Sequence, residues 1–114
     1  DGLGINFISV SESGKYLAIC EKGDVKAMCT IYDITSRKLK AQIPGTKIDS
    51  FPYQSKTFLS AHFDPKSERN KIMTLHSEPD WCITLWRWDE LKVILKIDLG
   101  LVQNNDPYYL SGTF

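Results

Sequence analysis

Cysteine is scarce in this sequence, and no two cysteines have the spacing of a metal-binding knuckle. The chain of 114 residues contains three, Cys20, Cys29 and Cys82. They are too few and too far apart for a disulfide framework or a CxxC zinc site, so we expect free thiols in a reducing, cytosolic compartment. Free cysteine on a strand usually acts as a small buried hydrophobe, and we therefore expect no catalytic thiol.

A long apolar run, a basic leader and an excess of one charge are also missing. The longest uncharged apolar stretch is residues 16–20, far short of the roughly 20 residues that a membrane helix needs. Fourteen Lys and Arg balance fourteen Asp and Glu, which removes the positive field that nucleic-acid or anionic-membrane binding usually requires. We expect neither partner. The chain starts without methionine or a signal-like segment, so we expect a piece of a longer protein.

Motifs for common catalytic chemistries are absent as well. There is no Gly-x-Ser-x-Gly, and Gly2 with Gly4 forms only the first part of a dinucleotide fingerprint. His62 and His76 have no metal-ligand spacing with the cysteines, so we expect structural or surface roles for both. The sequence predicts no enzyme activity, no cofactor and no metal site.

An internal repeat is the main feature that the sequence does contain. Residues 30–33 (Thr-Ile-Tyr-Asp) align with residues 84–87 (Thr-Leu-Trp-Arg), and Ile43 aligns with Ile97, at a constant separation of 54 residues. Upstream, residues 15–19 resemble residues 71–75 at a separation that differs by one or two, as loop insertions would produce. Repeats of this length are typical of solenoids, propellers and arrays.

Each copy contains four short segments that are rich in β-branched and aromatic residues and are separated by turn formers. We predict strands at 5–10, 16–21, 28–34 and 39–43, and again at 57–63, 71–75, 81–88 and 93–99. The last segment also fits a helical spacing at Trp88, Leu91 and Leu95, but its alternation from Val93 to Leu99 favours a strand. A further strand-like run, 108–114, follows a loop signal at 104–107.

Two four-stranded units with an aromatic residue near the end of the third strand resemble consecutive blades of a WD-repeat β-propeller. The resemblance implies an all-β fold of two antiparallel blades, 1–50 and 51–100, with 101–114 starting a third. Closed propellers typically have about four to eight blades, so the rest of its own propeller is an expected partner.

The family's Trp-Asp dipeptide is replaced here by Tyr32-Asp33 and by Trp86-Arg87. The family's turn aspartate, six residues ahead of the tryptophan, corresponds to Asp80, and Asp24 is the nearest candidate in the first copy. In that family an Asp, a His, a hydroxyl and the Trp form a buried hydrogen-bond network. The Gly-His pair that supplies the histidine is absent from both copies. We therefore expect incomplete networks and blades held mainly by packing.

Aromatic residues suggest a protein-interaction surface. In a propeller, the loops between blades and the hairpins between second and third strands share one face, and exposed aromatic residues there favour protein contacts. The candidates are Phe51, Tyr53, Trp81, Tyr108 and Tyr109. Packing between blades is an equally good explanation of Phe51 and Tyr53. The basic run 37–40 could meet an acidic partner such as a tubulin tail, but a solvated outer strand is the simpler interpretation.

Several segments are most similar in sequence to WD-repeat proteins of the ciliary axoneme, notably residues 15–19, 30–33, 58–65 and 103–105. The resemblance implies a non-catalytic scaffold that assembles or regulates inner dynein arms and cilium motility, with dynein-arm or microtubule-associated subunits as partners. Two alternatives stay open. One is a WD-repeat adaptor in another intracellular complex, and the other is a self-contained immunoglobulin-like β-sandwich, which also fits eight strands.

Overall fold

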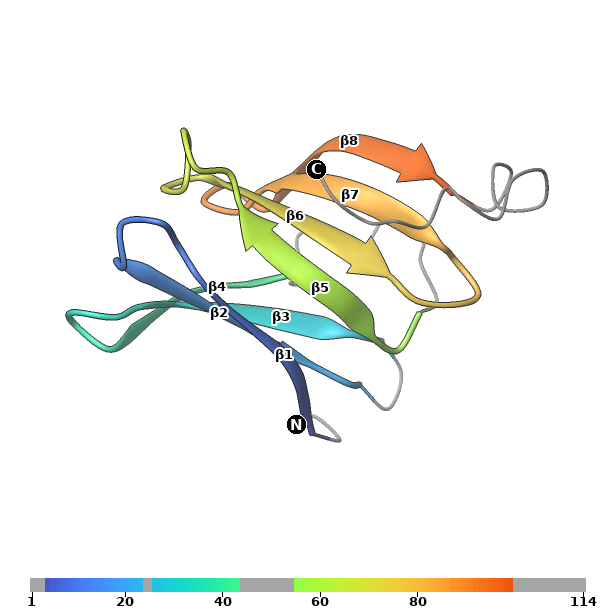
Figure 1. Ribbon diagram of the computed structural model, residues 1–114, viewed down its shortest axis with the longest axis horizontal. Helices are drawn as coiled ribbons and strands as arrows, with labels where there is room; N and C mark the ends of the chain where they lie inside the picture. Colours follow the sequence, from blue (N-terminus) through green and yellow to red (C-terminus); the bar gives the residue numbers. More distant parts are fainter. Residues whose placement is uncertain (1–3, 24–25, 44–54, 100–114) are drawn as a thin grey trace.

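A computed structural model describes residues 4–23, 26–43 and 55–99 of the chain. Within these residues the structure contains eight strands and no helix (Figure 1). The strands are β1 (Ile5–Val10), β2 (Tyr16–Glu21), β3 (Met28–Asp33), β4 (Lys38–Ile43), β5 (Phe58–Phe63), β6 (Lys71–His76), β7 (Cys82–Arg87) and β8 (Lys92–Asp98). They form two four-stranded antiparallel sheets, β1-β2-β3-β4 and β5-β6-β7-β8. The predicted all-β class is confirmed.

The predicted strands match the observed ones to within one residue at every end. The ambiguous segment after Trp88 is a strand, because β8 pairs along its whole length with β7. The expected start of a third copy at 108–114 lies outside the described residues. The predicted boundaries between the copies, at residues 50 and 100, also lie outside the described residues and stay predictions.

Both sheets repeat the same irregularities. The pairing of β1 with β2 shifts between Ile5 and Phe7, and that of β5 with β6 shifts between Phe58 and Ser60. The last hairpin of each sheet turns on a residue with positive φ, Arg37 at 61° and Leu91 at 54°. These two residues are 54 positions apart, so the sequence repeat is a repeat of backbone geometry.

One part of the sequence alignment is wrong by one residue. We matched residues 15–19 with 71–75, which places Leu17 opposite Met73. The pairing with the third strand instead places Leu17 with Ile72, because Leu17 faces Tyr32 and Ile72 faces Trp86. Register is set by hydrogen bonding to the neighbouring strand, whereas the match of Lys15 with Lys71 reflected only residue identity.

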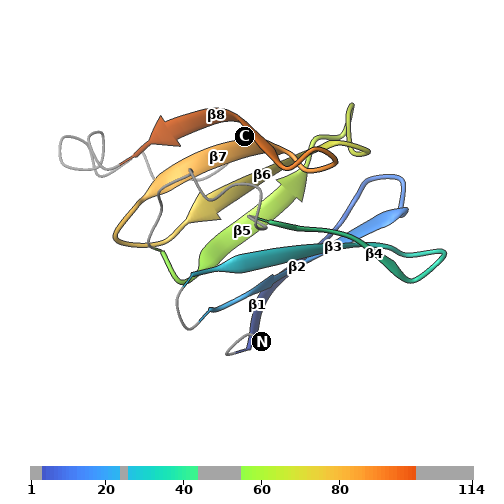
Figure 2. The same ribbon diagram turned by 180° about the vertical axis from the view of Figure 1, so that it is seen from behind.

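The two sheets lie against each other and are closest along their first strands (Figures 1 and 2). Strand β5 contacts β1, β2 and β3, while β8 is the strand of the second sheet farthest from the first. Aromatic rings close the contact: Tyr16 lies 5.2 Å from Trp88 and 6.1 Å from Phe63, measured between ring centroids. The core therefore lies between the sheets.

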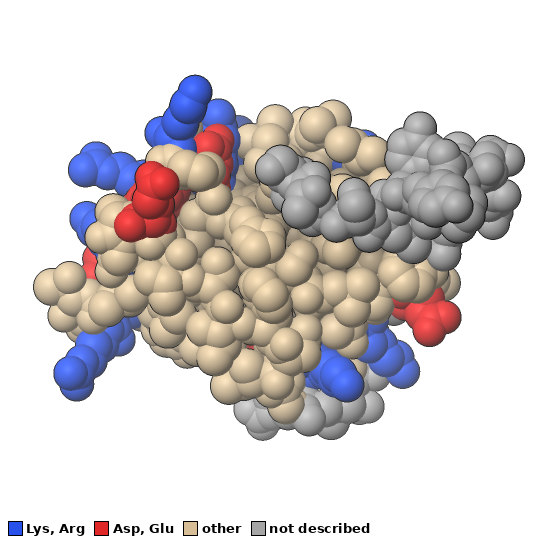
Figure 3. All heavy atoms as spheres, viewed as in Figure 1, with Lys and Arg blue, Asp and Glu red and all other residues tan. Residues whose placement is uncertain are grey.

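Most of the charged side chains on one face of the molecule lie at one end. Figure 3 shows them over the end that carries the β1–β2, β3–β4 and β5–β6 turns, with a smaller number toward the opposite end and a largely uncharged middle. The basic run 37–40 belongs to this end, where Lys38 and Lys40 are exposed on the edge strand β4. That placement agrees with the solvated outer strand expected from the sequence.

Polar contacts join the sheets at both ends of the interface. Ser13, in the β1–β2 turn, donates from its hydroxyl to Glu68 in the β5–β6 turn, and its amide also donates to Glu68. The pKa of Glu68 is lowered, chiefly by the Ser13 hydroxyl. At the opposite end, the Gly23 amide donates to the Lys56 carbonyl and the Ala27 amide to the Ser55 carbonyl, each at 3.0 Å.

Candidate functional site

A buried polar chain lies on the face of the second sheet that meets the first. The indole nitrogen of Trp86 donates to the Thr74 hydroxyl oxygen at 2.8 Å. The same oxygen lies 3.0 Å from Nε2 of His76, two residues farther along β6. All three side chains are fully buried. We call them, with Ser55 and Asp80, the buried network.

Ser55 and Asp80 extend the buried network to the segment that enters β5. The Asp80 carboxylate accepts a hydrogen bond from the Ser55 amide at 2.8 Å. The Ser55 hydroxyl lies 3.5 Å from Nδ1 of His76. These contacts hold together three parts of the second sheet: the segment before β5, the end of β6 and the β6–β7 turn.

The expectation of an incomplete network is wrong for the second copy. A histidine is present, but it comes from the end of β6 at position 76 rather than from the start of the repeat. Thr74 and His76 are two residues apart on one strand, so their side chains point to the same side. That spacing is visible in the sequence and indicates the pair without a Gly-His signal.

Burial keeps the histidine neutral. Its pKa is lowered from 6.5 to about 4, mainly because burial disfavours the imidazolium; nearby Asp80 opposes this effect and Lys96 adds to it. The ring also packs between aromatic neighbours, 4.8 Å from Phe58 edge to face and 6.4 Å from Trp86 in a parallel stack. His76 is a structural residue in this arrangement, as we expected.

The first sheet has different chemistry at the matching positions. Glu21 and Ile19 replace His76 and Thr74, and Tyr32 replaces Trp86, by the pairing of the strands. Asp24 lies outside the described residues.

Asp33 stabilises the β3–β4 turn. Its carboxylate accepts a hydrogen bond from the Ser36 amide at 3.0 Å, and this bond is the main reason that its pKa is lowered.

Removing the Asp80 carboxylate should loosen the second sheet. We expect Asp80→Ala to lower the free energy of unfolding by about 2 kcal/mol, because the Ser55 amide loses a charged acceptor at a partly buried site. Asp80→Asn, which keeps an acceptor oxygen, should lose less. Urea unfolding of the two variants would measure the difference; equal stability of Asp80→Ala and the unsubstituted chain would contradict a role for this bond.

The predicted interaction residues are only partly described. Trp81 is half-buried in the β6–β7 turn with φ of 43°. Its amide donates to the Ser77 carbonyl at 3.1 Å, and its carbonyl accepts from Leu99 at 2.8 Å. The other members of the set, Phe51, Tyr53, Tyr108 and Tyr109, lie outside the described residues. Their gathering on one face stays a prediction.

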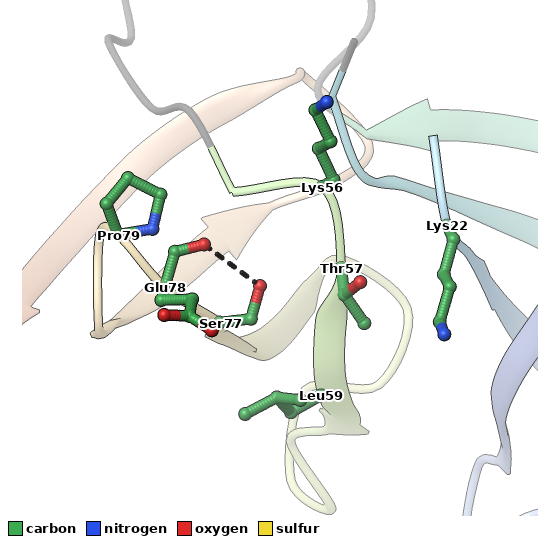
Figure 4. Close-up of a pocket in the computed structure, with 7 residues that line it drawn as sticks. All are labelled: Lys22, Lys56, Thr57, Leu59, Ser77, Glu78 and Pro79. Carbon is green, nitrogen blue, oxygen red and sulfur yellow. Dashed lines mark hydrogen bonds between the residues drawn. The ribbon is translucent and has the colours of Figure 1, made fainter. Parts of the chain in front are cut away.

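An open groove of about 480 Å³ lies next to that turn, between the two sheets. Its lining is Lys22, Lys56, Thr57, Leu59, Ser77, Glu78 and Pro79 (Figure 4). The ammonium groups of Lys22 and Lys56 point in opposite directions, and the Ser77 hydroxyl donates to the neighbouring Glu78 carbonyl at 3.3 Å. Charge does not converge on a ligand position here.

All three thiols are buried, and two of them, Cys29 and Cys82, resist ionisation. The pKa of Cys29 is raised well above its usual value by a hydrogen bond with Cys20 and by burial, and burial also raises the pKa of Cys82. In the parts of the chain that the structure describes, no group of three or more His, Cys, Asp or Glu could hold a metal ion. Those parts also contain no helix long and apolar enough to cross a membrane.

The contact between the sheets joins unlike faces. Across each sheet, directly paired residues form rows that point to one side. The row of the first sheet is Val10, Leu17, Tyr32 and Leu39, and the matching row of the second sheet is Phe63, Ile72, Trp86 and Val93. The second row lies in the core, with Ile72 and Trp86 fully buried. The first row points outward, with Val10 and Leu39 55% and 53% exposed.

The opposite faces show the reverse pattern. The row Ser9, Ala18, Ile31 and Ala41 of the first sheet matches the row His62, Met73, Leu85 and Leu95 of the second. Ala18 and Ile31 are fully buried, whereas Leu95 is 52% exposed. The face of the first sheet that contains Ala18 and Ile31 therefore packs on the face of the second sheet that contains Ile72 and Trp86. The described residues leave the other face of each sheet largely open, and in the rows named here that face is mainly apolar.

No protein-family model matches the chain. A segment of the mouse (Mus musculus) protein named cilia- and flagella-associated protein 57 is 34% identical to it over 113 residues, or 95% of the chain. The chain spans only 8% of the length of that relative. Nearly all of this chain is thus similar in sequence to one short segment of a cilia- and flagella-associated protein.

Proposed function

We propose that this chain is part of a non-catalytic WD-repeat β-propeller that acts as a protein-interaction scaffold in the axoneme of cilia and flagella. The finer role is to assemble or regulate inner dynein arms and so cilium motility. Two lines of support carry the proposal: the similarity to a protein named for cilia and flagella, and the packing of unlike sheet faces. The second is the observation on which the propeller depends.

Packing of unlike faces supports a propeller because two sheets packed in this way still leave an open face on each side. When one kind of face meets the other, each added sheet leaves a new open face, and the series ends only when it returns to its start. The open rows here are apolar and contain residues such as Val10, Leu39 and Leu95 that are about half exposed. In repeat architectures, neighbouring units cover such faces.

The immunoglobulin-like alternative fits these faces less well. In a two-sheet sandwich the inner faces form the core, and the outward residues along each strand are polar. Here outward positions of the first sheet are Ile8, Val10 and Leu17, and those of the second include Met73 and Leu85. The pattern favours a segment of a larger repeat array over a finished domain.

The proposed location can be tested in the longer protein of which this chain is a part. We expect a tagged form to be enriched in isolated axonemes and to cross-link to dynein-arm or microtubule-associated subunits. Diffuse cytosolic signal with no axonemal enrichment would contradict the ciliary role. Enrichment together with another set of partners would contradict only the dynein-arm role.

Trp81 offers a test of the interaction surface. We expect Trp81→Ala to reduce recovery of cross-linked partners several-fold while the stability of the protein stays within about 0.5 kcal/mol, because a half-buried turn side chain contributes more to contacts than to the core. Lys92→Ala, on the exposed start of β8, is the matched control. Loss of stability without loss of partners would instead assign Trp81 to packing.

A further inference from the structure

We propose that the groove between the β1–β2 and β5–β6 turns is a docking site for an acidic peptide, a short run of Asp or Glu residues in a partner protein. The groove has a volume of about 480 Å³ and lies at the end of the strands opposite Trp81. The inference adds a partner chemistry to the proposed scaffold role. It does not depend on the propeller, because two turns of this chain supply the residues that line the groove.

Three cationic side chains line this groove. Lys15 comes from the β1–β2 turn, and Lys66 and Arg69 come from the β5–β6 turn. All three are exposed, and none of them forms a direct ion pair with another described residue. Arg87 and Lys92, at the same end of the second sheet, are by contrast paired with carboxylates. The groove therefore brings together positive charges that the described part of the chain does not pair directly.

The one carboxylate in the lining is held mainly by neutral donors. Glu68 accepts hydrogen bonds from the Ser13 amide, at 3.2 Å, and from the Ser13 hydroxyl. Nearby Arg69 makes a smaller contribution to the lowered pKa of Glu68. This contact joins the two turns that form the groove, and it shows that the donors of the groove suit a carboxylate. With three cations and one carboxylate, the lining has an excess of positive charge.

Two further carboxylates lie close by but do not line the groove. Asp33 and Asp64 each accept a hydrogen bond at 3.0 Å from an amide of their own turn. Lys15 is near enough to Asp33 to contribute to its lowered pKa, although backbone hydrogen bonding is the main cause. These carboxylates stabilise turns and leave the cations of the groove available to a ligand.

Shape and charge favour a peptide over a nucleic acid or a membrane. Nucleic acids and anionic membranes are bound through a broad positive field, whereas this chain has equal numbers of acidic and basic residues. The groove is a local hollow with its three cations on two turns. Successive carboxylates of an acidic peptide would accept charge-assisted hydrogen bonds from the ammonium and guanidinium groups. The cations thus match a few carboxylates on one short segment.

The groove stays open in the proposed propeller. Neighbouring units in a repeat architecture pack on sheet faces, but the groove lies between turns at the ends of strands. Figure 1 shows both turns at the same end of the two sheets, and Figure 3 shows charged side chains there. Further sheets on the two open faces would therefore leave the groove uncovered.

Fluorescence anisotropy with a labelled peptide of six glutamates and the 114-residue chain tests the proposal. The groove variant replaces the three cations of the groove: Lys15→Ala, Lys66→Ala and Arg69→Ala. The control variant replaces three exposed lysines outside it: Lys22→Ala, Lys38→Ala and Lys40→Ala. The two variants have the same net charge. All six side chains are exposed, so circular dichroism and urea midpoints should match those of the unsubstituted chain.

We expect the groove variant to bind the peptide about ten-fold more weakly than the unsubstituted chain, and the control variant to stay within about two-fold of it. Added salt should weaken the binding, and a peptide of six glutamines should not bind. Equal weakening in the two variants would show a response to net charge alone and would overturn the inference. Absence of binding below about 1 mM peptide would overturn it as well.

A single-stranded DNA of six nucleotides separates the two kinds of anionic partner. Tighter binding of the DNA than of the glutamate peptide would overturn the acidic peptide as occupant, whereas weaker binding supports it. None of these measurements depends on where the protein is located. Failure of the inference would therefore leave the ciliary role standing, and a cytosolic protein could still bind the peptide.

Discussion

Replacing Trp86 with alanine should cause the largest loss of stability in this chain, about 3 to 5 kcal/mol in the free energy of unfolding. The side chain is fully buried between the sheets, so its removal leaves a large cavity. It also removes the donor to the Thr74 hydroxyl. Urea unfolding of the unsubstituted 114-residue chain and of its Trp86→Ala variant would measure the loss.

Tyr32 is the matched control because it occupies the same position in the first sheet. It lies half-buried on the open face, so Tyr32→Ala should cost about 1 kcal/mol or less in the same 114-residue chain. Similar losses at positions 32 and 86 would contradict the packing of unlike faces. Trp86→Phe, alone and together with Thr74→Val, would separate the hydrogen bond from the lost volume, because the double variant removes both partners.

The stability of the chain should fall as the pH is lowered from about 6.5 to about 4. The pKa of His76 is about 4 in the folded chain and near 6.5 when unfolded. Between these values the unfolded chain binds a proton that the folded chain does not, so protonation favours unfolding. The difference between the two pKa values corresponds to about 3 kcal/mol in the free energy of unfolding. The chain keeps this stability in full above pH 6.5 and has lost it by about pH 4.

His76→Gln should remove this pH dependence, because glutamine does not titrate. The control is His62→Gln, since His62 is exposed and its ring packs against Phe7. Asp33 and Glu68, whose pKa values are lowered, weaken stability only at a pH below their ordinary values of 3.8 and 4.5. Urea midpoints at pH 7.5, 6 and 5 separate the effects. A slope that persists in His76→Gln would show that another group is responsible.

Local pattern was enough to predict the strands. Residues 16–21 and 28–33 are rich in β-branched and aromatic side chains and are flanked by turn formers. The strands β2 and β3 have the same bounds. The separation of 54 residues between the two copies also holds for Arg37 and Leu91, the turn residues that both have positive φ. The alternation from Val93 to Leu99 was enough to choose strand over helix for the last segment.

The buried network was missed because its histidine stands at a position that the family pattern does not use. Hydrogen bonding between His76 and Thr74 depends on their common face, which period-2 spacing reveals. The contact of Asp80 with Ser55, by contrast, joins residues 25 positions apart across the sheet. No local spacing predicts such a contact, because it depends on how the segment before β5 lies against the β6–β7 turn.

The sequence by itself determined the number, order and turns of the strands, since these depend on side-chain alternation and on turn residues close together in the chain. Only the tertiary structure decided which face of each sheet is buried. Tyr32 and Trp86 occupy equivalent positions in the repeat, yet one is half-exposed and the other fully buried. The physical reason is that burial depends on what covers a face, and the residues that cover the inner face of each sheet belong to the other sheet, far away in the sequence.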